Sequence, residues 1–480
     1  MSTFDRFAPF VQDFIYDHQW ENLRGIQVAA AEAIFDTDAN VLLTASTASG
    51  KTEAAFFPIL TLFDEDPPAS IGAIYIGPLK ALINDQFLRL NDLCADAHIP
   101  VWHWHGDVSA SHKAKMHKIH IFILQITPES LEALLLHKHS AISKLFCDLR
   151  FVVIDEVHSL LRGDRGGQTI CLIERLSRMA GVNPRRIGLS ATIGDPQAVG
   201  AFLSSGTGRG WVVPKVAEPP RTWRLSMEHF YLSGPQAADA MGGQAEEALR
   251  SIDFIRQAKA AANPAQTQEL ALASLPVQPD EIEDEASSQP LPTLDVATDV
   301  APKEADPGLA YIFEHTRGKK CLVFANSRED AEAVCTELRR YCEAAHEQDR
   351  FLIHHGNLSS SLRESAEELM RDESQALTTI TTATLELGID IGKLERAFQI
   401  DAPFTVSAFL QRMGRTGRRG TPPEMWFVMR EEPPEPRSLL PETIPWKLLQ
   451  GIALVQLYRE ERWVEPPRLQ SQPSPCCYLS

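Results

Sequence analysis

The sequence lacks any apolar run long enough to cross a bilayer, so a membrane-spanning helix is excluded. Residues Met1 to Asp13 carry acidic side chains and contain no apolar core segment, so no secretory signal peptide is predicted. The eight cysteines include no C-x-x-C pair. Scattered cysteines without a signal peptide are typical of reduced thiols, and we therefore expect a cytoplasmic protein with no membrane partner.

The sequence also contains fewer basic than acidic residues. Lys and Arg number 46 against 64 Asp and Glu, which gives a formal net charge of −18. This balance argues against nucleic-acid binding, because nucleic-acid-binding proteins usually present a basic surface. Much of the acid, however, lies in one segment, Asp280 to Asp306, which holds a single lysine, Lys303. A groove elsewhere can stay locally basic, so nucleic-acid binding is not excluded.

The sequence does have a phosphate-binding pattern near its N-terminus. A short apolar run, Asn40 to Leu43, precedes a loop of small residues, and Glu53 to Phe56 after the loop is typical of a helix start. The loop reads Ala45, Ser46, Thr47, Ala48, Ser49, Gly50, Lys51 and Thr52. Small residues let consecutive N–H groups surround an anion, Lys51 can reach β- and γ-phosphates, and Thr52 can hold Mg²⁺. Ala45 stands where this pattern usually has glycine, and a Ser/Thr-rich turn before a helix is the alternative interpretation.

Two carboxylates follow a second apolar run. Phe151 to Ile154 predicts a buried parallel strand, and it ends in Asp155 and Glu156, followed by Val157 and His158. Carboxylates at the carboxyl end of such a strand lie where ligands bind in an open α/β sheet. Asp155 would hold Mg²⁺, partly through water, and Glu156 would orient or deprotonate an attacking water. The alternative is a solvated acidic turn, which the preceding apolar run and the upstream loop disfavour.

The order of the apolar runs predicts two α/β domains. Strands alternate with helical stretches in a first domain, residues 1–232, which implies a doubly wound parallel sheet. An Ala-rich and then acidic, Pro-containing stretch, residues 233–306, is predicted as a linker or insertion between the domains. The alternation resumes in a second domain, residues 307–431. The expected strands are Val41–Leu43, Ala73–Ile76, Val101–Trp104, Phe122–Gln125, Phe151–Ile154, Arg186–Leu189, Cys321–Phe324, Phe351–Ile353, Thr378–Thr382, Ala397–Asp401 and Met425–Met429.

The last segment, residues 432–480, begins with a Pro-rich break and contains an amphipathic helix over Trp446 to Arg462. The apolar stripe of this helix needs a partner. Either the helix packs on the second domain, or further sequence is missing. The aperiodic tail from Gln470 to Ser480 favours a truncated end, and a protein partner at this helix is a further expectation.

The ordered motifs resemble a superfamily 2 helicase core with a DEVH box, over about Gln27 to Arg418. Most pieces are weak alone, because Thr-Pro-Glu or Ser-Ala-Thr occurs in many proteins as a helix cap or turn. The resemblance implies two RecA-like domains that bind ATP and Mg²⁺ between them. The matching pieces are Gln27, the phosphate loop, Pro78–Leu82, Thr127–Ser130, the DEVH box, Ser190–Thr192, Leu322–Phe324, Thr382–Asp390 and Gln411–Arg418.

The resemblance also assigns roles to single residues. Gln27 would read the adenine edge, and Gly388 and Asp390 would lie at the nucleotide, with Asp390 on its sugar. Arg415 and Arg418 would stabilise the charge that builds on the γ-phosphate, and Gln411 would orient the water. A basic surface turn that binds nucleic acid nonspecifically is the alternative for this stretch. Phosphates of a nucleic-acid strand would be gripped, with little base preference, at Pro78, Lys80, Thr127, Pro128, Ser190, Thr192, Thr382 and Thr384.

Three short stretches are similar to the Lhr (large helicase-related) and related DNA-helicase branch rather than to DEAD-box RNA helicases: Gly50–Ala54, Arg165–Gly166 and Leu385–Asp390. This resemblance implies an ATP-dependent translocase or helicase on single-stranded or tailed DNA, with 3′-to-5′ polarity. We also expect a monomer and, as the default, a role in DNA repair, with mobile-element defence as the alternative. Members of the branch usually continue into a winged helix, which only Trp446 to about Arg468 could begin here. The alternatives are RNA remodelling, and an ATPase that binds a strand without unwinding it.

A histidine cluster offers a further candidate site. His103 and His105 would lie on one face of a strand, and a metal site is one interpretation. Surface histidines beside a nucleic-acid path are the favoured one, because no cysteine or second His-x-His stands nearby. The other members of the cluster are His112, His117 and His120.

Overall fold

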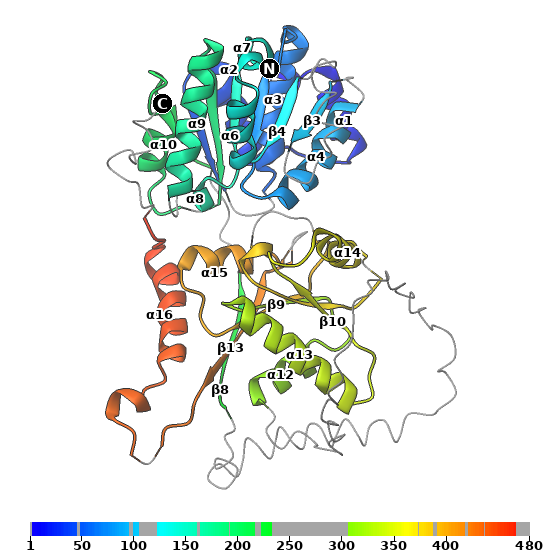
Figure 1. Ribbon diagram of the computed structural model, residues 1–480, viewed down its shortest axis with the longest axis vertical. Coiled ribbons are helices and arrows are strands. Elements are labelled where there is room, and N and C mark those ends of the chain that lie inside the picture. The colour runs from blue at the N-terminus through cyan, green and yellow to red at the C-terminus, as the bar shows by residue number, and fades with distance from the viewer. Residues whose placement is uncertain are drawn as a thin grey trace, which may run out of the picture.

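The computed structural model shows two α/β domains, with the first above the second in Figure 1. The predicted insertion, residues 233–306, falls outside the described residues except for Asp306, as does the tail from Gln470 to Ser480. The structure describes residues 2–45, 49–95, 99–104, 122–160, 164–191, 193–216, 222–232, 306–372, 374–386, 391–417, 421–435 and 437–466.

The first domain is built on a seven-stranded sheet with strand order β3-β4-β2-β5-β6-β1-β7, in which neighbouring strands are parallel. This confirms the predicted parallel sheet, and the six expected strands lie within one residue of observed ones. The strands are β1 (Asn40–Thr44), β2 (Ala73–Ile76), β3 (Val101–Trp104), β4 (Ile123–Ile126), β5 (Phe151–Ile154), β6 (Arg185–Ser190) and β7 (Trp211–Val212). The helices are η1 (Phe4–Arg6), α1 (Pro9–Asp17), α2 (Gly25–Asp36), α3 (Lys51–Glu65), α4 (Lys80–Ala95), α6 (Pro128–His137), α7 (His139–Leu145), α8 (Val157–Leu160), α9 (Asp164–Ala180) and α10 (Pro196–Ser204).

Side chains of this sheet alternate between two cores, one on each face. In β1, Val41 and Leu43 pack with helices α1 to α4, whereas Leu42 between them packs with α6 to α10. Strands that are covered on both faces need continuous apolar sequence, and this explains why the strand runs were visible in the sequence. Polar residues are therefore displaced to the strand ends, where they can form a site.

Two buried arginines at the start of β6 fasten helices to the sheet. Arg185 donates hydrogen bonds to three carbonyls at and just beyond the C-terminal end of α2. Arg186 donates to two carbonyls at the end of α10 and pairs with Glu174. The last carbonyls of a helix have no partner within the helix, so these guanidinium groups satisfy acceptors that would otherwise be buried and unpaired.

The second domain has a six-stranded sheet, again with parallel neighbours, in the order β10-β11-β9-β12-β13-β8. Its helices α12 and α13 pack on one face of the sheet. The strands are β8 (Arg224–Tyr231), β9 (Cys321–Phe324), β10 (Phe351–His354), β11 (Thr378–Thr381), β12 (Arg396–Ile400) and β13 (Glu424–Glu431). The helices are α12 (Pro307–His315), α13 (Arg328–Ala344), α14 (Ser360–Arg371), η4 (Ala383–Leu385), α15 (Val406–Met413), η5 (Leu440–Thr443) and α16 (Trp446–Glu461).

Strand β8 corrects the predicted domain boundary. The sequence places it at the end of the first domain, residues 1–232, but it pairs with β13 over eight residues, from Arg224 opposite Glu424 to Tyr231 opposite Glu431. Pairing partners so far apart in the chain cannot be read from local pattern, because an edge strand carries no signal of the sheet that it joins. The insertion therefore begins and ends in the second domain rather than between the domains.

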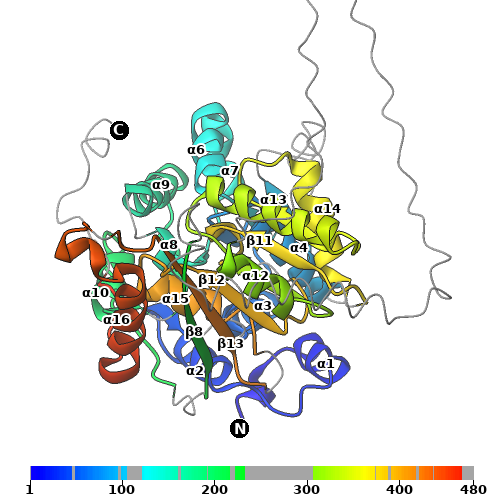
Figure 2. The same cartoon turned by 90° about the horizontal axis from the view of Figure 1, so that it is seen from below.

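The C-terminal helix α16 packs on the second domain, which was one of the two outcomes expected for it. Gly451 lies against the side chain of Met429 in β13, and Tyr458 stacks on Trp223 with ring centroids 5.2 Å apart. Figure 2 shows α16 beside β8, β13 and α15 on one side of this domain.

The described cysteines are mostly free thiols, as expected: Cys94, Cys147, Cys321, Cys335 and Cys342. Cys171 is disulfide-bonded, so the expectation of reduced thiols is wrong at that position. No helix within the described ranges combines the length and apolar character needed to cross a membrane.

Candidate active site

The phosphate loop lies between β1 and α3, as the sequence predicts. Gly50, just before α3, has a φ of 81°, a left-handed conformation that suits glycine. Lys51 donates from Nζ to the carbonyl oxygen of Ala45 at 2.8 Å, so its ammonium group is folded over the loop. Ser49 and Thr52 are buried beside it. A lysine above a helix N-terminus gives this loop the charge and the N–H groups that a phosphate needs.

Gln27 lies in the first turn of α2, against the same loop. It is fully buried, and its Oε1 accepts the Arg24 N–H at 2.9 Å. Its Nε2 has no hydrogen-bond partner among the described residues. A Cβ atom placed on Gly50 would lie 2.8 Å from that Nε2, so the amide stands directly beside the phosphate loop. An unpartnered buried donor in this position fits recognition of a nucleotide.

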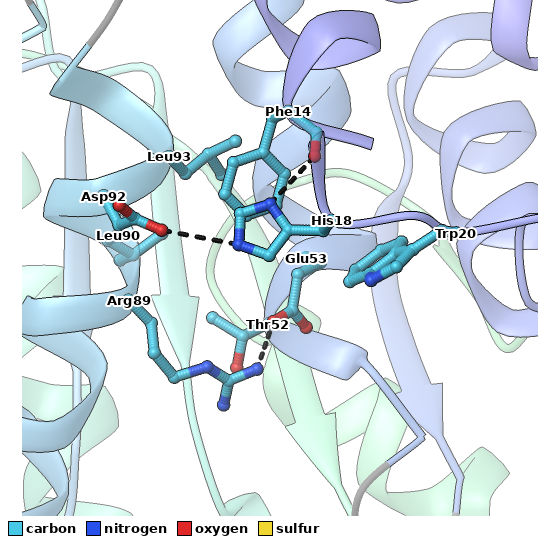
Figure 3. Close-up of a pocket in the computed structure, with 9 residues that line it drawn as sticks. All are labelled: Phe14, His18, Trp20, Thr52, Glu53, Arg89, Leu90, Asp92 and Leu93. Carbon is cyan, nitrogen blue, oxygen red and sulfur yellow. Dashed lines mark hydrogen bonds and ion pairs between the residues drawn. The ribbon is translucent and has the colours of Figure 1, made fainter. Parts of the chain in front are cut away.

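A cavity of about 200 Å³ opens beside the first turn of α3 (Figure 3). Three rings form one side of it, and the ring centroids of Phe14 and His18 are 4.0 Å apart. An aromatic wall next to a phosphate loop suits a flat nucleobase, because such a base can stack on aromatic rings. The lining residues are Phe14, His18, Trp20, Thr52, Glu53, Arg89, Leu90, Asp92 and Leu93.

Asp155 is buried at the end of β5 and is held by two donors. The hydroxyl of Tyr75, in the neighbouring strand β2, donates to Oδ2, and the Glu156 N–H donates to Oδ1 at 2.8 Å. Burial and the negative charge of Glu156 raise the pKa of Asp155 to about 7, against the opposing effects of these hydrogen bonds and of Lys51. A nearby cation would favour the ionised carboxylate.

Glu156 is connected to the end of β6 through His158. The Nε2 of His158 lies 3.3 Å from Oε2 of Glu156, and its Nδ1 accepts the Ala191 N–H at 3.2 Å. Because a ring nitrogen that accepts an amide proton carries none, the ring proton of neutral His158 lies on Nε2, facing Glu156. The Ser190 hydroxyl lies 3.1 Å from the same Nδ1. Glu156 also has a φ of 49°, an uncommon conformation that sets the direction of its side chain.

The residues present fit Mg²⁺. Asp155 and Thr52 offer carboxylate and hydroxyl oxygens, the ligands that Mg²⁺ prefers. Within the described ranges, no group of three or more His, Cys, Asp or Glu side chains is arranged to hold a metal. An ion at this position would therefore take most of its ligands from water and from phosphate oxygens, as the sequence predicts.

The second domain contributes α15 and the turn after it. Gln411, near the end of α15, is buried, and its Nε2 has no partner in the described part of the chain. Arg415 is buried and donates to the carbonyl oxygen of Glu386 at 2.7 Å. Figure 1 places α15 at the edge of the second domain that faces α8, the helix that begins within the DEVH box. The helix that carries Gln411 thus lies at the edge of the second domain nearest the first.

Arg412 was not singled out from the sequence, although it lies within the matched stretch. It pairs with Glu386 and donates to Oε1 of Gln399 at 2.6 Å and to Oδ1 of Asn326 at 3.2 Å. The network is buried and ties α15 to β12 and to the loop after β9. Arg412 therefore fixes the helix, while Arg415 stays the arginine that the motif predicts to act on the nucleotide phosphates.

The predicted strand-contacting residues of the first domain share a support, Arg165. Its guanidinium donates to the carbonyl oxygen of Pro78 at 2.6 Å and pairs with Glu129 at 2.7 Å, so it joins the loop after β2 to the first turn of α6. Thr127 caps α6 through the Ser130 N–H at 3.3 Å, and Pro128 is the first residue of that helix. Lys80 is exposed at the start of α4.

In the second domain, Thr382 precedes η4 and Thr384 lies within it. The Thr384 hydroxyl lies 3.1 Å from Nδ1 of buried His354, and Nε2 of that histidine lies 3.2 Å from Oε1 of Glu367. A hydroxyl, an imidazole and a carboxylate therefore form one chain of hydrogen bonds. Sequence reasoning missed His354 and Glu367, and also Tyr75, a hydroxyl in an otherwise aliphatic strand.

Several predicted residues lie outside the described ranges. They are Ser46, Thr47, Ala48, Thr192, Gly388, Asp390 and Arg418, together with His105, His112, His117 and His120 of the histidine cluster. His103 is described, and its ring packs edge-on against Phe87 with centroids 4.2 Å apart.

The chain matches two protein families and several known helicases. Residues 24–199 match the DEAD/DEAH box helicase family, and residues 307–420 match the helicase conserved C-terminal domain. The ATP-dependent helicase Lhr-Core of Methanothermobacter thermautotrophicus is 28% identical over 400 residues, which cover 79% of this chain and 39% of that protein. The chain thus spans well under half the length of this relative.

Solved structures share the fold. The helicase Lhr of Mycobacterium smegmatis, bound to ssDNA and AMP-PNP, has a TM-score of 0.68 and 24% identity over 98% of this chain and 52% of that one. Mss116p, bound to ssRNA and AMP-PNP, has a TM-score of 0.65 and 16% identity over 98% of this chain and 79% of that one. With the phosphate loop, the DEVH box and α15 placed as described, the chain carries a DEAD/DEAH box helicase domain followed by a helicase conserved C-terminal domain.

Proposed function

We propose that the chain couples ATP hydrolysis to movement along a single nucleic-acid strand, with DNA preferred over RNA and with 3′-to-5′ polarity. The observation that supports the proposal is the division of the candidate phosphoryl-transfer residues between two domains. Lys51, Asp155 and Glu156 belong to the first domain, and Gln411 belongs to α15 of the second, a helix at the edge that faces α8. Such a site is complete only when both halves meet around the nucleotide.

Each half-site has a distinct task in this proposal. Lys51 would exchange the Ala45 carbonyl for phosphate oxygens, and Mg²⁺ at Asp155 would neutralise phosphate charge. Glu156 would take the proton of the attacking water, and the nearby His158 ring would hold the Glu156 carboxylate in place. Arg415 would add positive charge where the γ-phosphate becomes more negative.

The grip on the strand would follow the state of the nucleotide. Ser190 contacts His158, and His158 contacts Glu156, so a shift of the loop after β6 alters the position of the candidate base. Strand phosphates would lie along the loops at Pro78, Lys80 and Thr127 and, in the second domain, at Thr382 and Thr384. Such contacts position a strand and carry little sequence information.

The preference for DNA is supported by similarity. Identity to the solved Lhr helicase that was captured with ssDNA is 24%, against 16% to Mss116p with ssRNA. RNA remodelling is the second candidate, because the same core fold occurs with both polymers. The monomeric state, the cytoplasmic location, the role in DNA repair and a protein partner at α16 stay predictions.

The test is ATP hydrolysis by the purified chain, alone and with single-stranded DNA or RNA of equal length, beside Lys51→Ala and Glu156→Gln. We expect strong stimulation by DNA that both substitutions abolish, followed by unwinding of duplexes with a 3′ tail and not a 5′ tail. Stimulation by RNA alone would contradict the DNA preference. Hydrolysis without strand separation would support the ATPase that binds a strand without unwinding it, and no hydrolysis with either polymer would contradict the proposal.

A further inference from the structure

The chain after α16 touches both domains within four residues. Arg462, with a φ of 55°, ends the helix in the left-handed conformation, and the Trp463 N–H donates back to the carbonyl oxygen of Leu457 at 3.1 Å. This turn directs the segment Trp463–Pro466, which we name the strap, away from the helix axis and toward α15. The helix itself is anchored to the second domain, where Lys447 pairs with Asp401 at 2.8 Å.

On the second domain, the strap caps α15. Glu465 accepts the N–H groups of Val406 at 2.5 Å and Ser407 at 3.1 Å, and the Thr405 hydroxyl accepts that of Ala408 at 3.1 Å. The first N–H groups of a helix have no partner within it, and a carboxylate there also interacts favourably with the helix dipole. Glu465 thus fixes the start of the helix that ends beside Gln411.

Hydrophobic burial holds the strap in this place. Val464 is 4% exposed and belongs to the same core cluster as Val406, Phe409, Met413 and Leu454. The strap is therefore packed on α15 by an apolar side chain and bonded to it by the next residue, so the two move together.

On the first domain, the strap lies against Gly194. A Cβ atom at this position would be 2.3 Å from the carbonyl oxygen of Val464 and 3.0 Å from that of Glu465, so no residue with a side chain fits without displacement. Gly194 is in the loop between β6 and α10, four residues after Ser190, which contacts His158. The contact is made by backbone on both sides, which makes it sensitive to small shifts.

We propose that Glu465 is a positioning residue for ATP hydrolysis: through the strap it sets the placement of α15, and with it Gln411 and Arg415, relative to the loop that follows Ser190. The inference rests on the proposed function. Contacts connect Glu156 to His158 and His158 to Ser190 at the end of β6. Gly194 follows Ser190 by four residues in the chain and contacts the strap, which is bonded to α15 through Glu465.

The test compares Glu465→Ala and Glu465→Gln with Glu461→Ala, a substitution of an exposed glutamate at the end of α16. We measure kcat and KM for ATP at saturating single-stranded DNA. Glu465→Ala should lower kcat about tenfold and leave KM within about twofold, because Gln27 and Lys51, which would hold the adenine and the phosphates, lie in the first domain. Glu465→Gln keeps one acceptor oxygen and should fall less, and Glu461→Ala should match the wild type. An equal loss in Glu461→Ala, or a parallel rise in KM, would overturn the proposal.

Gly194→Ala approaches the same contact from the other domain. It should lower kcat in the same way, and the double variant with Glu465→Gln should lose less than the two separate losses combined, because both act on one contact. Wild-type kcat in Gly194→Ala, or full additivity, would overturn the proposal even where Glu465→Ala does not fold.

Hydrogen exchange gives a readout that does not depend on activity. In Glu465→Ala, exchange should rise at Val406 and Ser407 and also in residues 193–195 across the domain boundary. A rise confined to α15 would show a local cap and would overturn the coupling. If the wild type hydrolyses no ATP, the proposed function fails, while this measurement still decides whether the strap connects the two domains.

Discussion

Replacing His158 with alanine tests the connection between Glu156 and the end of β6. The imidazole accepts the Ala191 N–H on Nδ1, and its Nε2 lies 3.3 Å from Oε2 of Glu156. A polar contact with a charged group contributes about 2 kcal/mol, and if this contribution acts on the orientation of the base, kcat should fall about thirtyfold. The KM for ATP should change little, because Lys51 and Gln27 are untouched.

The substitution should also lower stability. It leaves the buried Ala191 N–H without its acceptor, which should lower the free energy of unfolding of the first domain by about 1–3 kcal/mol. The assays are DNA-stimulated ATP hydrolysis and denaturant unfolding, with His139→Ala, an exposed histidine on α7, as the control. A kcat within twofold of the wild type, in a folded variant, would refute the assignment of His158 to the orientation of Glu156.

Four further substitutions test other parts of the site and fold. Lys51→Ala should abolish ATP binding, measured with a fluorescent nucleotide, because the ammonium group that lies at the Ala45 carbonyl is removed. Tyr75→Phe removes a donor from Asp155 and should raise the Mg²⁺ concentration for half-maximal ATPase about threefold to tenfold, with KM unchanged at saturating Mg²⁺. His354→Ala removes one of the two partners of the Thr384 hydroxyl and should weaken single-strand binding in fluorescence anisotropy about threefold to tenfold, while nucleotide affinity is retained. Arg185→Met leaves three carbonyls at the end of α2 without a donor and should destabilise the first domain by about 3 kcal/mol in denaturant unfolding.

Local pattern was sufficient for the strands and for the positions of several candidate residues at the strand ends. The strands are buried on both faces, so each one appears as a short apolar run, and the chemistry follows directly at its carboxyl end in Ala45, Asp155 and Ser190. Lys51, Gly50 and Asp155 stand where the motif spacing predicts them. Gln27 and Gln411 were selected through the resemblance, because composition alone does not predict a role for either side chain.

The remaining features depend on contacts between distant residues. β8 gives no sign of the sheet that it joins, because its partner β13 lies two hundred residues later. Tyr75 and His354 contact residues that become their neighbours only after folding. Thr127 serves as a helix cap in the structure, a role that its predicted contact with a nucleic-acid strand does not require. Glu465 could not be distinguished from the other acidic residues near the C-terminus until its two N–H donors were seen.

The pairing of β8 with β13 determines which body carries the long acidic segment. The chain leaves the first sheet at Val212 and enters the second sheet at Arg224, so the covalent connection between the two domains is complete before Leu232. Both ends of the segment, Tyr231 at the end of β8 and Asp306 at the start of α12, belong to the second domain. Shortening the segment, or inserting a fluorophore-labelling tag within it, would therefore modify the second domain without tethering it to the first.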